Sequence, residues 1–169
     1  MIEVKVKDTD LQQAAGEDMD AFINVFVDAM HHAIGGNLTA ENLSELNADQ
    51  ITLLAYVAFR DEVMNGGFVQ LIHNGWGEFI YKNPFDKALR NWGLQDLYRM
   101  ISKSHRFYRA YHEEIEKECT QEEFDAMYEK YSEFDDFDDS FVENEEMFTA
   151  QVAHYIDEHI DNFATIEHE

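Results

Sequence analysis

Apolar residues recur at helical spacing along most of the chain, apart from its first residues. The opening segment, MIEVKVK, alternates apolar and polar positions, which predicts a short strand over residues 1–7. From Phe22 to Ile34 the apolar residues then fall at steps of three and four, which is typical of an amphipathic helix. Gly35 and Gly36 follow directly and predict the end of this helix.

The middle of the chain predicts two helices separated by glycines. Asn47 and Gln50 have the spacing of a capping box, which opens a helix that runs to about Met64. The sequence Asn65-Gly66-Gly67 breaks this helix, and a short helix follows from Phe68 to about His73. The stretch therefore predicts a tight corner between two helices.

The second half of the chain continues the helical pattern. Apolar positions predict a long amphipathic helix from Leu94 to Ile115 and a last helix from Phe148 to Phe163. Three further helix starts are predicted from capping residues, namely Asn83-Pro84 (for a helix ending at Gly93), Thr120 with Glu123, and Ser140 with Glu143.

These elements predict an all-α fold. The 169 residues contain one proline and eight glycines, so few residues interrupt helices. No repeat or linker-like composition divides the chain. We expect a single compact helical domain over residues 1–169, with about seven helices and a short N-terminal strand.

Charge is unevenly distributed and points to a basic partner. The formal net charge is −24, from 36 acidic and 12 basic residues. Residues 51–100 contain five of each, whereas residues 119–169 contain 17 acids and one base, and residues 1–50 contain ten acids and two bases. This patterning disfavours direct binding to nucleic acid or anionic membrane, and it favours a negative surface for a basic protein.

The segment EFDDFDDSFVENEE, residues 133–146, interleaves eight carboxylates with three phenylalanines. The phenylalanines recur at helical steps, which predicts a buried aromatic stripe with acids displayed outside. The predicted partner-binding acids are Glu122, Glu123, Asp125, Glu129, Glu133, Asp135, Asp136, Asp138, Asp139, Glu143, Glu145 and Glu146, and a possible extension of the surface comprises Glu17, Asp18, Asp20 and Asp28.

No catalytic site, metal site or cofactor is expected. Acid–base catalysis needs two carboxylates in different environments, and these acids look uniformly exposed. The acidic segment has no glycine for a calcium loop, and Cys119 has no cysteine partner for a zinc site. His105 and His112 lie on the apolar stripe of their helix, which favours hydrogen-bonded core histidines. The chain shows no signal-peptide pattern, which predicts a cytoplasmic protein.

The stretch EVMNGGFVQLIHNGWG, residues 62–77, is the most distinctive motif. We interpret it as a structural signature made of Glu62, Asn65, Gly66, Gly67, Phe68, Gln70, Asn74 and Gly77. Its glycines allow backbone angles that other residues avoid. Its side-chain amides are expected to satisfy backbone groups at the broken helix ends.

This motif resembles the signature of a bacterial family of small acidic helical proteins, mostly of unknown function. The resemblance extends through ALRNWG, residues 88–93, into residues 134–163, and covers about residues 40–165. The best-known family member is a DNA mimic that works as a dimer and keeps a helix-turn-helix transcription factor off its operator. The resemblance implies a helical fold and a protein-binding role without a catalytic step.

We therefore predict a mimic of double-stranded DNA that acts as a homodimer. Its acidic surface would bind a basic DNA-binding protein, such as a transcription factor or nucleoid protein, and block DNA binding. The alternative is an immunity or anti-restriction protein that neutralises a basic toxin or nuclease with the same acids. A metal-dependent enzyme is the second alternative.

Overall fold

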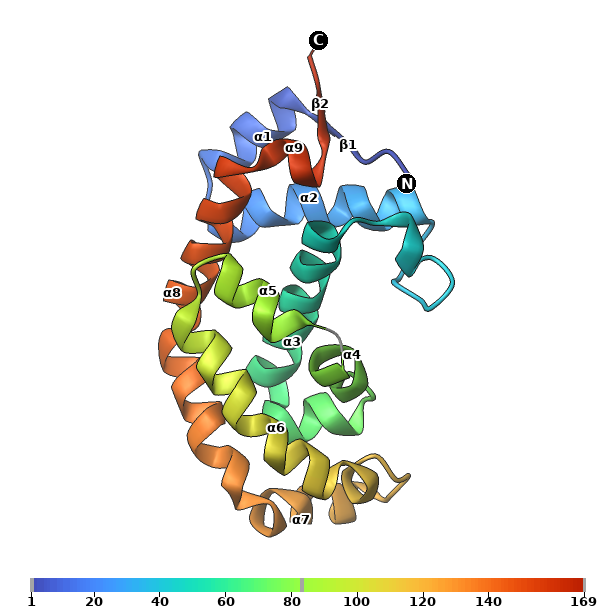
Figure 1. Cartoon of the computed structure of the whole chain (residues 1–169), viewed down its shortest axis with the longest axis vertical. Helices are drawn as coiled ribbons and strands as arrows, with labels where there is room; N and C mark the ends of the chain where they lie inside the picture. The colour runs from blue at the N-terminus through green and yellow to red at the C-terminus, as the bar shows by residue number, and fades with distance from the viewer. Residues whose placement is uncertain (1, 83, 169) are drawn as a thin grey trace. The chain divides into compact units, whose positions relative to one another are not determined.

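The computed structural model describes residues 2–82 and 84–168, and it confirms the all-α fold (Figure 1). These residues form nine α-helices, two short 3₁₀ helices and two three-residue strands. Their contacts group into two compact units. Unit 1 comprises Met1–Leu54 and Thr149–Glu169, and unit 2 comprises Ala55–Phe148. The expectation of a single domain stays a prediction.

In chain order the elements are β1 (Lys5–Lys7), α1 (Asp8–Ala15), α2 (Met19–Ile34), η1 (Leu43–Glu45), α3 (Ala48–His73), α4 (Gly77–Lys82), α5 (Phe85–Asn91), α6 (Gln95–Ile115), α7 (Gln121–Lys130), η2 (Ser132–Phe134), α8 (Asp135–Glu158), α9 (Ile160–Phe163) and β2 (Thr165–Glu167). The two long helices α3 and α8 contribute residues to both units.

The two ends of the chain meet in unit 1. Strand β1 pairs in parallel with β2, with Val6 opposite Ile166, so the predicted N-terminal strand is confirmed over three residues. Its partner was not predicted, because three C-terminal residues are too few to show an alternating pattern. Val4 and Val6 are buried beside this pairing, which gives the N-terminal segment an apolar attachment to the unit.

Helix α2 forms where the apolar periodicity predicts it. Ile23, Phe26 and Met30 are fully buried and lie on one helical face. The Asp18 carboxylate caps the first turn by accepting the Ala21 N–H at 2.7 Å. Gly35 ends the helix with φ of 81°, a left-handed angle that glycine adopts without a Cβ clash.

The predicted capping box at the start of α3 is confirmed and has a second role. The Asn47 and Gln50 side chains each accept the other's backbone N–H, at 2.8 and 2.9 Å. Their amide groups also donate to the carbonyl oxygens of Asn162 and Phe163, at 2.7 and 2.8 Å. The beginning of α3 is therefore bonded to α9 within unit 1.

Phenylalanines from α3, η2 and α8 pack together in the core of unit 2. The Phe59 ring lies edge-on to Phe68 and to Phe141, with ring centroids 5.4 and 5.1 Å apart. Phe68 stacks on Phe134 at 6.0 Å. Phe59, Phe68, Phe134 and Phe141 are all fully buried, which confirms the aromatic stripe predicted in the acidic segment at Phe134 and Phe141, whereas Phe137 is half-buried.

Several predicted helix boundaries differ from those observed. Ser140 lies inside α8, so the predicted capping box with Glu143 is wrong and the acidic segment continues directly into the last long helix. The predicted cap at Asn83 lies outside the described residues, and Pro84 precedes the first turn of α5. Helices α1 and α4 were not predicted, because eight and six residues carry too little periodicity.

Candidate functional site

Helix α8 displays acids on one side and aromatic rings on the other. A helix turns about 100° per residue, so residues three and four apart share a side. Phe134, immediately before α8, and Phe141 and Phe148 within it occupy the buried side. The opposite side carries what we call the acidic face of α8, which consists of the exposed residues Asp135, Asp136, Asp139, Glu143 and Glu146.

The predicted partner-binding acids differ in exposure. Nine of the twelve are exposed, namely Glu122, Glu123, Asp125 and Glu129 around α7 and the five residues of the acidic face. Glu133, Asp138 and Glu145 are only half-exposed. All twelve belong to unit 2.

Asp138 points into unit 2 and bonds to the signature motif. Its carboxylate Oδ1 accepts the backbone N–H of Phe68 at 2.8 Å. Phe68 follows the two residues with non-helical angles inside α3, Gly66 (φ −153°, ψ 15°) and Gly67 (φ 73°, ψ −173°), which we call the glycine break. Asp138 therefore caps the helical segment that restarts at Phe68, although it lies 70 residues further along the chain.

Glycine is required at position 67 for two reasons. The backbone angles fall in a region that residues with a side chain rarely adopt. A Cβ at this position would also lie 2.5 Å from Oδ2 of Asp138. The close approach of the carboxylate to the backbone is what allows the cap on Phe68 to form.

A tyrosine of α7 holds the other side of the glycine break. The Tyr128 hydroxyl donates to the carbonyl oxygen of Gly66 at 2.8 Å. The expectation that the motif's own amides satisfy these backbone groups was therefore wrong, since Asp138 and Tyr128 do so from α8 and α7. The reason is geometric: backbone groups that turn away from their own helix meet side chains of neighbouring helices.

The polar side chains of the motif bond to one another instead. The Glu62 carboxylate accepts hydrogen bonds from Gln70 at 2.8 Å and from Asn74 at 2.9 Å. The side-chain Oε1 of Gln70 in turn accepts a hydrogen bond from the Asn65 side-chain amide at 3.1 Å. These bonds join α3 on both sides of the glycine break, which supports the interpretation of the motif as structural.

Burial raises the pKa of Asp138 to about 7. The hydrogen bond from Phe68 opposes this shift, whereas the nearby Asp135 and Asp139 carboxylates add to it. A pKa raised above the unfolded value of about 3.9 means that the folded protein binds more protons between about pH 4 and about pH 7. The contribution of Asp138 to the free energy of unfolding therefore falls as the pH rises through this window.

Asp138→Asn is expected to remove this pH dependence, because the amide oxygen still accepts the Phe68 N–H but no longer titrates. Relative to Asp138→Asn, the wild-type protein should be more stable at about pH 5 than at about pH 8, by roughly 1–3 kcal/mol. Urea unfolding of both proteins at the two pH values measures this difference. An equal stability difference between the two proteins at both pH values would show that folding does not raise the pKa of Asp138, and a difference of the opposite sign would show that the Phe68 hydrogen bond lowers it.

Glu133 also has a partner within unit 2. Its carboxylate accepts a short hydrogen bond from the Tyr111 hydroxyl. This bond lowers the pKa of Glu133 and raises that of Tyr111. Glu133 thus links η2 to α6.

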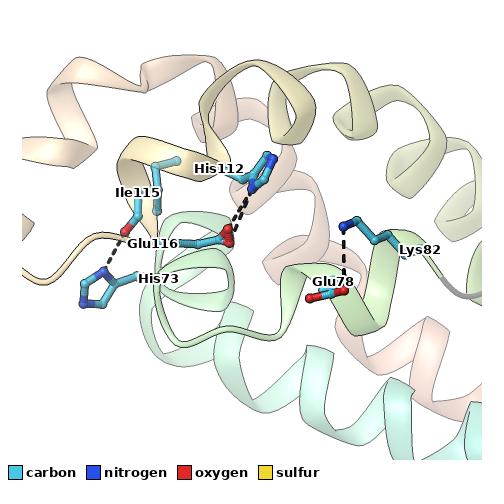
Figure 2. A network of polar contacts seen from close by, with 6 residues as sticks. All are labelled: His73, Glu78, Lys82, His112, Ile115 and Glu116. Carbon is cyan, nitrogen blue, oxygen red and sulfur yellow. Dashed lines mark hydrogen bonds and ion pairs between the residues drawn. The ribbon is translucent and has the colours of Figure 1, made fainter.

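One histidine contact joins α3 to α6, and a second lies at the end of α6 (Figure 2). His73 Nδ1 lies 2.7 Å from the carbonyl oxygen of Ile115, and must donate because a carbonyl only accepts. His112 Nδ1 lies 2.7 Å from Oε1 of Glu116, the residue that follows α6. His105 and His112 are half-buried and do not lie in the core. Among the described residues, no three histidine, cysteine, aspartate or glutamate side chains form a group that could hold a metal ion.

The predicted extension of the surface lies in unit 1. Glu17, Asp18, Asp20 and Asp28 are all exposed, but Asp18 is already engaged as the cap of α2.

Two residues that matter to the site, Tyr128 and Tyr111, were not predicted from the sequence. Their hydrogen-bond partners lie 62 and 22 residues away along the chain. Across residues 2–82 and 84–168, no helix has the length and hydrophobicity that a membrane crossing requires.

Comparison with known proteins identifies the family. Residues 44–159, which include the motif and the acidic segment, match the family model described as DMP19-like protein. The chain is also similar to the DNA mimic protein DMP19 of Neisseria meningitidis serogroup B (strain ATCC BAA-335 / MC58). The two are 32% identical over 127 residues, which cover 75% of this chain and 77% of the relative. The chain belongs to the DMP19-like protein family.

Proposed function

We propose that this protein is a mimic of double-stranded DNA that binds a basic DNA-binding protein and blocks its access to DNA. The observation that carries the proposal is the acidic face of α8, which presents five exposed carboxylates directly opposite a buried aromatic row. No lysine or arginine occurs in the sequence from residue 131 to residue 169. The name of the Neisseria relative supports the same role.

Electrostatics explain how such a surface would compete with DNA. Proteins that bind DNA neutralise phosphates with lysine and arginine, and this term is independent of base sequence. Exposed carboxylates on a fixed helix would attract the same side chains and raise the rate of association. While the acidic face is bound, the partner's basic surface is covered and cannot contact phosphates.

The anchoring of the acidic face would strengthen binding. Phe134 and Phe141 fix the helix to the core, and the Asp138 bond to Phe68 fixes its first turn to α3. A helix that is already ordered loses little conformational entropy when a partner binds. The proposal includes a homodimer, as the family resemblance implies, which would present two copies of the face.

A pull-down from the source cell tests the proposal. Immobilised protein, loaded at low salt, should retain a basic DNA-binding protein that duplex DNA elutes. Inorganic phosphate at the same ionic strength should elute it less effectively, because it lacks the multivalency of DNA. Elution of a toxin or nuclease would favour the immunity alternative, and the absence of any DNA-eluted basic protein would contradict the proposal.

A further inference from the structure

Unit 1 contains a groove that is separate from the acidic face of α8, which belongs to unit 2. The groove has a volume of about 470 Å³ and lies between residues at the end of α1, the first turns of α2 and the last turns of α8. Its lining includes Asp18, Met19, Phe22 and Asp157. We propose that this groove docks a cationic amphipathic helix of a partner protein, with an apolar side chain inserted between α2 and α8.

The floor of the groove is apolar and accessible. Met19 is 40% exposed, which makes it one of four large hydrophobic side chains at this exposure among the described residues. Phe22 is half-buried. Its ring packs edge-on against the buried Phe26, with ring centroids 5.4 Å apart, and this contact holds the Phe22 side chain in place. Covering these two side chains would remove apolar surface from water, which favours an occupant with an apolar side chain.

The small side chains suit a helix rather than a compact ligand. Ala15, Ala150 and Ala153 line the groove and come from two different helices. Alanines at these positions leave room for the backbone of a partner's helix to approach. Recognition of this kind places one apolar face of a helix in a groove between two others.

The charge of unit 1 selects a cationic occupant. The unit contains fifteen acidic residues and two lysines, a formal charge of −13, and both lysines are in β1. Asp18 and Asp157 lie in the groove, and neither forms an ion pair with a lysine or arginine among the described residues. Lysines beside the inserted side chain could reach both carboxylates, whereas a second copy of unit 1 would bring the same negative charge.

This inference goes beyond the proposed function, because it concerns a different unit and adds an apolar contact to the electrostatic one. The two can fail independently. Loss of the groove would leave binding through the acidic face of α8 intact, and the groove can be tested without the natural partner.

The experiment uses two fluorescent synthetic helices of about four turns. Both carry the same lysines, but one has a leucine stripe where the other has alanines, so that charge and helicity match. Fluorescence anisotropy measures their binding to the wild-type protein and to Met19→Gln. Met64→Gln is the matched control, since Met64 is a 43% exposed methionine in unit 2.

The leucine helix should bind the wild-type protein roughly tenfold more tightly than the alanine helix, and the difference should persist at about 0.5 M salt. Met19→Gln should weaken the leucine helix by roughly fivefold and leave the alanine helix unchanged, whereas Met64→Gln should affect neither. Equal binding of the two helices would overturn the inference. So would a dimer that Met19→Gln dissociates and that excludes the leucine helix, because the groove would then hold a second copy.

Discussion

Reversing three charges on the acidic face of α8 is expected to abolish partner binding. The variant combines Asp139→Lys, Glu143→Lys and Glu146→Lys, which lie on one side of the helix and are all exposed. Three attractive contacts become repulsive, so the affinity for the retained partner should fall by about 100-fold or more at low salt. Anisotropy or calorimetry with the purified partner measures the loss.

The choice of residues keeps the fold intact. Asp138 is left unchanged because it caps Phe68, and Asp135 and Asp136 are left because acids favour the first turn of a helix. The matched control combines Asp61→Lys, Glu78→Lys and Asp96→Lys. It changes the net charge by the same amount as the first variant, at exposed positions of unit 2 that lie outside residues 133–146. Equal losses in the two variants would show that net charge matters and that the acidic face of α8 does not.

The second large effect concerns folding, and it is expected from Gly67→Ala. The substitution forces a side chain into φ of 73° and ψ of −173°, and it displaces the Asp138 carboxylate from the Phe68 N–H. Strain and the lost cap together should lower the free energy of unfolding by about 3–4 kcal/mol. Gly75→Ala is the control, since its φ is also positive but the added Cβ meets no atom within 4 Å beyond its chain neighbours.

Urea unfolding of both variants measures the difference, and a double-mutant cycle identifies its cause. Once Asp138→Ala has removed the carboxylate, Gly67→Ala should cost roughly 1–2 kcal/mol less than in the wild-type background. Additive effects would show that the carboxylate and the glycine act separately. A cost for Gly67→Ala no larger than that for Gly75→Ala would contradict the close approach altogether.

The Asp138 cap shows how far the sequence could predict the site. The sequence predicts the exposure of nine of the twelve acids and the burial of Phe134 and Phe141, because helical periodicity is a local property. The same periodicity places Asp138 four residues after Phe134 and three before Phe141, which is the buried side, so its inward orientation could have been predicted. Its bond to Phe68 could not, because that contact joins residues 70 positions apart.

Other features depended on contacts that leave no local pattern. The Tyr128 bond to Gly66 and the pairing of β1 with β2 both join distant parts of the chain. The helix start predicted at Ser140 is wrong. Ser140 and Glu143 have the three-residue spacing of a capping box, but the buried phenylalanines on either side keep α8 continuous. Tertiary burial overrides a local capping signal at this point.

Mutual exclusion between this protein and DNA is the most direct test of the proposed function. The purified partner is first saturated with labelled duplex DNA, and this protein is then titrated in at several DNA concentrations. DNA mimicry predicts complete displacement of the DNA, with an apparent dissociation constant that rises in proportion to the free DNA concentration. A ternary complex of partner, DNA and this protein, or an apparent constant that does not change with DNA, would contradict it.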